Sequence, residues 1–298
     1  MEEETLNNYL KAGKIAAEAR EYGRALVKPG VSILEVAEQI EAKIRSLGGK
    51  PAFPVNISFN DTAAHYTPAP NDTILFDDQV VKLDVGVHVD GFVGGDTAVT
   101  IDLSGKYSEL VKASRDALDA AIKVVQVGTA LRDIGKEIEQ AIGSYGLKPV
   151  RNLSGHGIGE WTVHTAPSIP NYDTGDDDVL EEGMTIAIEP FASMGAGLIQ
   201  DKGIPQIHAI IGKKPVRNMG TRQVLKMLQP LNGLPFAPRW LTKEMPVFKV
   251  NFALKELDQL NMLHSYAPLV DKEGGFISQA EHSLYVGDKV IVMTRDQG

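Results

Sequence analysis

The chain has 298 residues, of which 43% are hydrophobic and 23% charged, so we expect a soluble globular protein with a large core. The formal net charge of −9 argues against a nucleic-acid-binding surface spread over the whole protein. The chain contains no cysteine, which excludes disulfides, thiolate metal sites and cysteine nucleophiles. Any metal site must therefore use oxygen and imidazole ligands.

The N-terminal segment MEEETLNNYL is acidic and lacks the apolar core of a signal peptide. No apolar run approaches the roughly 20 residues that a membrane-spanning helix needs. We therefore expect a cytoplasmic protein that has no membrane partner.

Two pairs of helices are predicted in the first half of the chain. Apolar residues recur at helical spacing over 3–27, and a capping box of Ser32 and Glu35 opens the next helix, which glycines at 48 and 49 end. A second pair is predicted over 108–125 and 130–144.

The two helix pairs belong to an internal repeat. VKPGVSILEVAEQIEAKIRSLGGKP (27–51) and VQVGTALRDIGKEIEQAIGSYGLKP (125–149) share nine identities in 25 positions at a constant offset of 98. The likeness continues into an acidic turn and an apolar strand that ends in Asp84 in one copy and Glu189 in the other. Two such copies form a cleft where they face each other about a pseudo-twofold axis, so we expect Asp84 and Glu189 to lie close together.

Residues 213–275 break this pattern. They contain six prolines and short helical stretches near 221–228 and 253–263, so we predict an inserted helical subdomain there. The remaining parts, 1–212 and 276–298, form the predicted catalytic domain, and strand-like residues resume at 278–294 with Glu281 among them.

The segment KLDVGVHVDGFVGGDT (82–97) is typical of a β-hairpin with a two-residue Asp90-Gly91 turn. Two further aspartates, Asp84 and Asp96, interrupt its strands, where an unpaired carboxylate is costly to bury. With a regular ladder their side chains would point to opposite faces of the sheet. If both serve one site, an extra residue must be absorbed, either by a β-bulge at Gly94-Gly95 or by a longer turn.

Four carboxylates in or beside apolar strands, together with one histidine, indicate a metal site. A hard, oxygen-rich set of this kind suits two divalent ions such as Co, Mn, Fe, Zn or Ni, held in the manner of a two-metal hydrolytic centre. The five residues are Asp84, Asp96, His156, Glu189 and Glu281.

The order and spacing of these residues resemble the methionine aminopeptidase family, within the wider pita-bread group. The helical insert between Glu189 and Glu281 is similar to that of the type 2 branch, found in archaea and the eukaryotic cytosol. The resemblance covers nearly the whole chain and is carried by PAFPVNISFNDTAAHYTP (51–68), DVGVHVDGFVGGDTAVT (84–100), NLSGHGIGEWTVH (152–164), GMTIAIEPFAS (183–193) and SQAEHSLYV (278–286).

The resemblance implies an α+β pita-bread fold and a role for each matching residue. Asp84 would bind one metal, Asp96 and Glu281 would bridge both, and His156 and Glu189 would complete the second. Glu189 would also shuttle a proton. The substrate would be contacted by His65, His164, Phe53 and Val163, the last two in an apolar methionine pocket.

The implied reaction removes the initiator methionine from nascent polypeptides that have a small second residue. We expect a monomer that acts on polypeptide N-termini near the ribosome, without binding nucleic acid directly. Two alternatives stay open: an Xaa-Pro peptidase of the same fold, which shares the five ligands, and a non-catalytic binding relative.

Overall fold

The computed structural model describes residues 1–295, so the last three residues of the predicted catalytic domain lie outside it. No helix in this range is both long and apolar enough to span a membrane. The helices are α1 (Glu3–Leu26), α2 (Ile33–Ser46), α3 (Ser108–Val124), α4 (Leu131–Ser144), α5 (Met219–Leu228), α6 (Pro238–Leu241) and α7 (Val247–Gln259).

The longest strands are β4, β5 and β8, and the strand pairs of residues 1–295 are all antiparallel. They are β1 (Lys50–Pro51), β2 (Asn56–Phe59), β3 (Thr62–Ala64), β4 (Val80–Val89), β5 (Phe92–Asp102), β6 (Lys148–Pro149), β7 (Ser154–Gly159), β8 (Thr162–Pro170), β9 (Thr185–Ile188), β10 (Phe191–Ser193), β11 (Ile199–Asp201), β12 (Ile207–Ile210), β13 (Leu263–Tyr266), β14 (Leu269–Asp271), β15 (Ile277–Gln279), β16 (His282–Tyr285) and β17 (Ile291–Val292).

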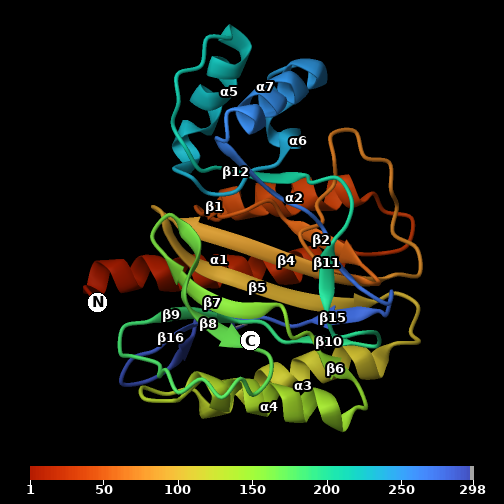
Figure 1. Ribbon diagram of the computed structural model, residues 1–298, viewed down its shortest axis with the longest axis vertical. Coiled ribbons are helices and arrows are strands. Elements are labelled where there is room, and N and C mark those ends of the chain that lie inside the picture. Colours follow the sequence, from red (N-terminus) through yellow and green to blue (C-terminus); the bar gives the residue numbers. More distant parts are fainter. Residues whose placement is uncertain (296–298) are drawn as a thin grey trace.

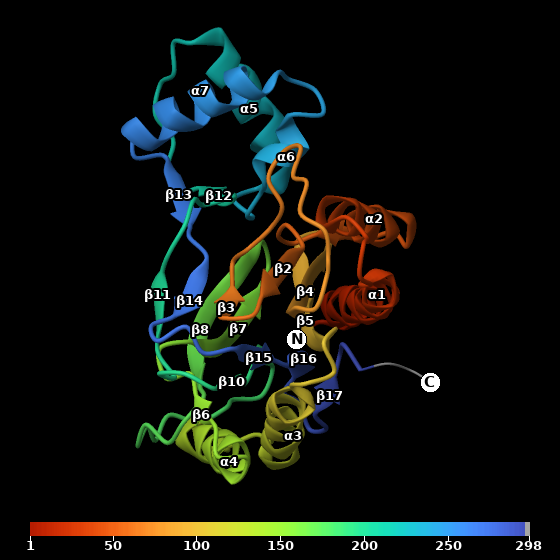
Figure 2. The same ribbon diagram turned by 90° about the vertical axis from the view of Figure 1, so that its right-hand side faces the viewer.

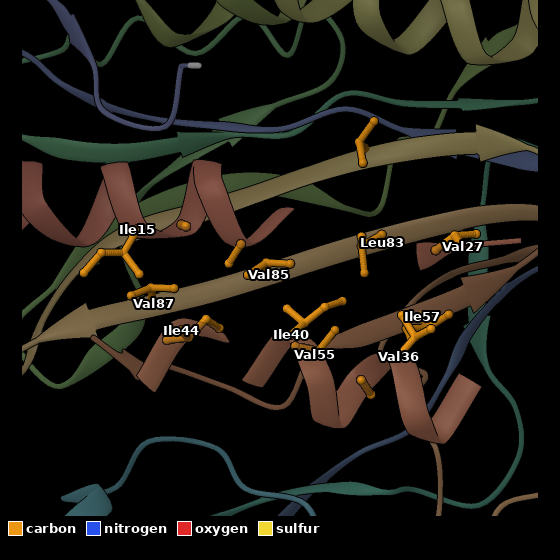
Figure 3. Packing of buried hydrophobic residues seen from close by; sticks show 14 of the residues in the cluster. Ile15, Val27, Val36, Ile40, Ile44, Val55, Ile57, Leu83, Val85 and Val87 are labelled. Atoms are coloured by element: carbon orange, nitrogen blue, oxygen red, sulfur yellow. The ribbon is translucent and has the colours of Figure 1, made fainter. Parts of the chain in front are cut away.

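In the first half, α1 and α2 cover one face of the sheet formed by β1, β2, β4 and β5 (Figures 1 and 2). The apolar face of α2 packs against β4, as Figure 3 shows for Ile40 and Ile44 beside Val85 and Val87. Burying each of these side chains contributes about 1.5–3 kcal/mol. The Ser32 cap is confirmed, because its hydroxyl accepts the Glu35 N–H.

The second half repeats this arrangement, as the offset of 98 predicted. Helices α2 and α4 have 14 residues each, and β1 and β6 occupy equivalent Lys-Pro dipeptides. Helices α3 and α4 pack over an apolar cluster that includes Ile138 and Ile186 (Figure 2). The two halves thus place their sheets against each other, with helices outside.

The β4–β5 hairpin contains the predicted bulge. Its turn has positive φ at Asp90 (50°) and Gly91 (95°), as a two-residue type I′ turn requires. His88 pairs with Val93 but Val87 pairs with Gly95, so Gly94 is the extra residue. Beyond it Asp96 lies opposite Gly86, two residues from Asp84. Both aspartates therefore face the same side of the sheet.

The glycine pair in the bulge is required by space and not by an unusual backbone angle. Neither Gly94 nor Gly95 has a positive φ. Instead, a Cβ on Gly94 would lie 2.1 Å from the Tyr9 carbonyl oxygen, and one on Gly95 would lie 2.5 Å from Ala16 Cβ. Helix α1 therefore packs directly on the bulged strand, and space rather than backbone angle requires glycine.

The two halves are joined by β5 and the segment from β15 to β16, in which Glu281 stands between the two strands. The Glu281 N–H donates to the Ala98 carbonyl (3.1 Å), and the Ser283 hydroxyl accepts the Asp96 N–H (2.8 Å). Thr100 bonds both the N–H and the carbonyl of its partner Gln279. These bonds set the carboxylates of Asp96 and Glu281 side by side across the pseudo-twofold axis.

The insert lies at one end of the molecule, with α5, α6 and α7 stacked beyond β12 and β13 (Figures 1 and 2). It has its own apolar cluster, which includes Val224, Val250 and Leu257. The helix predicted over 253–263 was misplaced: α7 begins at Val247 and ends at Gln259, since Asn261 adopts a left-handed φ of 51°. Strands β13 and β14 follow within 213–275.

Candidate metal centre and substrate cavity

All nine predicted site residues line one cavity of about 220 Å³ between the two halves and the insert. The first half contributes Phe53, His65, Asp84 and Asp96. The second half contributes His156, Val163, His164, Glu189 and Glu281.

The His156 ring points between two carboxylates. Its Nε2 lies 3.8 Å from Asp96 Oδ2 and 3.7 Å from Glu189 Oε1. Its Nδ1 lies 3.1 Å from the Gly157 carbonyl oxygen. Because a carbonyl only accepts, Nδ1 carries the proton and Nε2 presents a lone pair to the carboxylates. This is the orientation that a metal ligand needs.

Glycines on both sides of His156 let neighbouring strands approach it. A Cβ on Gly155 would lie 2.3 Å from the Ala187 carbonyl oxygen, and one on Gly157 would lie 2.1 Å from that of Ala166. The SGHGIG segment therefore fits only with glycine at these positions, and it holds the imidazole against β9.

The pKa values of all four carboxyl groups are raised above their usual range. Burial raises the pKa of Asp84 to about 7, an effect that the Gln279 side chain opposes. Burial and then neighbouring carboxylates raise the pKa values of Asp96, Glu189 and Glu281 well above their usual range. Arg20 opposes this shift only in part at Glu281. The group lacks positive charge, which cations would supply.

The donor atoms fit divalent cations. Ligand atoms of Asp96, His156 and Glu281 lie within 4.8 Å of one another. Within residues 1–295, Asp84 Oδ1 and Glu281 Oε2 are buried and have no hydrogen-bond partner. An unpartnered buried carboxylate oxygen is costly unless an ion binds it, so the residues present suit a metal.

Asp84 and Glu189 lie close together, as the repeat predicted. The Gln279 amide donates to Glu189 Oε2 (3.2 Å). It also hydrogen-bonds Asp84, which opposes the rise in the pKa of that carboxyl. Asp84 in turn raises the pKa of Glu189. The equivalent ends of two repeated strands thus meet at one glutamine.

Two further histidines line the cavity beside this cluster. The ring centres of His164 and His156 are 4.3 Å apart, and those of His65 and Tyr266 are 5.5 Å apart. His65 adopts a left-handed φ of 63°, an uncommon conformation for a residue other than glycine. Burial, with a smaller contribution from His164, lowers the pKa of His65 to about 4, so its ring is neutral at pH 7.

An apolar pocket adjoins the carboxylates. Phe53 and Val163 pack with Leu234 from the insert in one buried cluster. The Phe53 ring lies directly on Gly86, where a Cβ would be 2.2 Å from the ring. The glycine two residues after Asp84 therefore lets the aromatic wall lie close to the carboxylate.

Sequence reasoning missed several residues that line this cavity. Asn56 lies opposite Asp84 in the β2–β4 register and stands in a quoted motif, so the pairing of β2 could have identified it. The lining residues Pro235 and Tyr266 come from the insert, where no sequence motif marked them. The other missed lining residues are Ala64, Asn152, Leu153, Ser154, Phe191 and Ile207.

The remaining histidines do not line the cavity. His88 accepts the Gly91 N–H at the hairpin turn, His208 contacts the Ser265 hydroxyl, and His282 contacts Thr294. His264 is exposed, as are Asp90 and the acidic run 176–178.

Comparison with known proteins agrees with this site. The model of metallopeptidase family M24 matches residues 7–217. The methionine aminopeptidase of Archaeoglobus fulgidus is 45% identical over 290 residues, which cover 97% of each chain. That of Methanocaldococcus jannaschii is 43% identical over 296 residues, or 99% of each chain.

A solved methionine aminopeptidase from Thermotoga maritima has a TM-score of 0.73 at 24% identity, and the match covers 99% of this chain and 98% of that one. The expected α+β pita-bread fold is therefore confirmed. These relatives favour neither an Xaa-Pro peptidase nor a non-catalytic binding protein. The chain belongs to metallopeptidase family M24 and, within it, to the methionine aminopeptidases.

Proposed function

We propose that this protein removes the initiator methionine from nascent polypeptides with the help of two divalent cations. The observation that carries the proposal is the convergence of four buried carboxylates and the His156 lone pair on one cavity, with two carboxylate oxygens unpartnered. Two divalent ions would balance four carboxylate charges, and Co, Mn, Fe, Zn and Ni all suit this donor set.

Each ligand has a proposed place. Asp84 would hold one ion, Asp96 and Glu281 would contact both, and His156 and Glu189 would hold the other. When bound, such a pair polarises the scissile carbonyl and activates a water molecule. The backbone bonds between β5, which contains Asp96, and the segment around Glu281 support their shared role.

Glu189 is the proposed proton shuttle. Burial and the nearby Asp96 and Asp84 raise its pKa, so its carboxylate is a stronger base than an exposed glutamate and suits proton transfer. It would take a proton from the attacking water and return it to the amine that leaves. The His164 ring, beside His156, would hydrogen-bond the substrate near the scissile carbonyl, and the neutral His65 ring would bind it from the opposite wall.

The methionine side chain would occupy the pocket of Phe53, Val163 and Leu234. We propose that the residue after this methionine is small, as in the family that the chain resembles. We further propose a monomer that meets nascent N-termini near the ribosome in the cytoplasm, without direct nucleic-acid contact.

A cleavage assay with a metal count tests this function. Met-Ala-Ser and an Xaa-Pro dipeptide are offered to the metal-loaded and the chelator-treated protein. We expect Met-Ala-Ser to be cleaved, cleavage to stop after chelation, and elemental analysis to find two ions per chain. Preference for the Xaa-Pro dipeptide would reject the proposed substrate, and undiminished cleavage after complete metal removal would reject the site.

A further inference from the structure

A buried ion pair joins the helical insert to the first half of the molecule. Arg239 in α6 donates from Nη2 to Glu41 Oε1 in α2, and the Trp240 indole donates to Glu41 Oε2 (2.8 Å). The two charged residues are 2% and 1% exposed. Removing two charges from water is costly, and an apolar contact would hold the insert equally well. Attachment of the insert alone therefore does not explain why an ion pair is buried at this interface.

The hydrogen bonds of this pair continue into the segment that lines the cavity. Arg239 Nη1 donates to the Thr67 hydroxyl (2.7 Å), which donates to the Val55 carbonyl (2.6 Å). The Val55 N–H points back to Glu41 Oε1 (3.4 Å). Both backbone groups of Val55 are thus held by the same network, one through each partner of the ion pair.

Each arm of the network lies next to a wall of the cavity. Phe53 precedes Val55 by two residues, and His65 precedes Thr67 by two. Pro235 lines the cavity four residues before Arg239, and the neighbouring Leu234 packs against Phe53. The network therefore connects three walls of the cavity: the apolar wall at Phe53, the wall at His65, and the wall that the insert forms at Pro235.

We propose that Glu41 and Arg239 are positioning residues that set the width of the methionine pocket by holding the insert at a fixed distance from segment 53–67. This inference rests on the function proposed above, because it concerns how that pocket selects its side chain.

A second ion pair across the same interface provides a matched control. Lys243 Nζ lies 2.9 Å from Glu38 Oε1, again joining the insert to α2, but the two side chains are 55% and 39% exposed. Neither residue lines the cavity. If attachment of the insert to α2 alone governed the pocket, loss of this exposed pair would also change methionine selectivity, although by less than loss of the buried pair.

The test compares three variants of the metal-loaded protein. Arg239→Lys keeps the charge but cannot span both Glu41 and Thr67, Thr67→Val removes the hydroxyl link alone, and Lys243→Met removes the surface pair. We measure kcat and KM for Met-Ala-Ser and Leu-Ala-Ser, together with the affinity for free methionine by calorimetry.

For Arg239→Lys and Thr67→Val we expect the preference for methionine over leucine in kcat/KM to fall about tenfold. KM should rise while kcat changes by less than about twofold, because the carboxylate cluster is not displaced. Free methionine should bind about tenfold more weakly to these variants. Lys243→Met should match the wild type in each measurement.

The outcomes separate the two proposals. Wild-type protein that binds methionine but does not cleave Met-Ala-Ser would reject the proposed function alone, and calorimetry would still test the pocket. Should Arg239→Lys fail to fold, Thr67→Val decides the matter without unpairing a charge. Unchanged methionine affinity and unchanged Met/Leu preference in a folded Thr67→Val variant would overturn the positioning role.

Discussion

The two halves of the molecule share one arrangement of helices and strands but differ in how the central strands are connected. In the first, β4 and β5 are joined by the two-residue turn Asp90-Gly91. In the second, the corresponding strands β10 and β15 are joined by residues 194–276, which include the insert. The repeated part brings carboxylates to the axis, and the unrepeated part adds the third wall of the cavity.

The same contrast appears at one repeated residue. Glu41 and Glu139 are identical at the offset of 98 and lie in equivalent helices. Glu139 bonds Arg151 at the surface, where the two side chains are 33% and 54% exposed. Glu41 is buried because the insert covers it and supplies Arg239. An insertion in one half has thus changed the surroundings of a residue in the other.

The largest expected effect concerns the equivalent strand ends Asp84 and Glu189. Both are proposed metal ligands, but only Glu189 would also transfer a proton. Glu189→Gln should lower kcat about 10²–10⁴-fold, even with excess metal. Asp84→Asn should chiefly weaken metal binding, so that added metal restores part of its activity.

Metal titrations of the two variants, followed by activity and by calorimetry, measure this difference. Equal rescue of both variants would mean that the halves contribute equivalent ligands and that the proton is carried elsewhere. Full activity of Glu189→Gln would reject its role outright.

Removal of metal should expose the repulsion among the four carboxylates, two from each half. The folded-state pKa of Asp84 is raised to about 7 from a usual 3.8, and the other three are raised as well. The metal-free folded state therefore binds more protons than the unfolded state from about pH 4 upward. Its stability should fall as pH rises from about 5 to 7, by up to about 1.4 kcal/mol per pH unit for the Asp84 carboxyl, and the other three carboxyl groups add to this fall.

Thermal unfolding of chelator-treated protein between pH 5 and 8 checks this expectation. Added divalent cation should raise the melting temperature most at pH 8, because the carboxylates are then deprotonated. A metal-free melting temperature that rises toward pH 8 would contradict the electrostatic account.

The comparison of Glu41 with Glu139 predicts the next effect. Glu41→Ala leaves the Arg239 guanidinium buried without its carboxylate and should cost about 3–5 kcal/mol. Glu139→Ala removes an exposed pair and should cost less than about 1 kcal/mol. Urea unfolding at one pH measures both. Similar losses would show that the insert has not changed the energetic role of this residue.

Much of the repeated body could be predicted from the sequence. Its helices follow apolar periodicity and caps such as Ser32, and the identities at a fixed offset imply equivalent folds. The spacing of Asp84 and Asp96 even predicted that one extra residue is absorbed by a bulge or a longer turn, because side chains alternate along a strand. The resemblance to a known family then brought five distant ligand positions together, which no local pattern could do.

Features that depend on contacts between distant segments were missed. The need for glycine at position 94 comes from the Tyr9 carbonyl of α1, about 85 residues away in sequence. Arg239 is one of 30 basic residues and carries no mark of its burial opposite Glu41. Tertiary packing determines both the glycine at position 94 and the burial of Arg239, and the local periodicity of a sequence does not reveal such contacts.

The smallest expected effect concerns two glycines of α4, which stand where α2 has Ala37 and Arg45. A Cβ on Gly143 would have no neighbour within 4 Å, whereas one on Gly135 would lie 2.1 Å from the Tyr172 carbonyl oxygen. Gly143→Ala should therefore stabilise the protein by about 0.5–1 kcal/mol, because alanine restricts the unfolded chain. Gly135→Ala should destabilise it by about 1–3 kcal/mol, since backbone must move. Melting temperatures that shift in the same direction for both variants would mean that α4 can slide over β8 and is not fixed as closely as α2 is over β4.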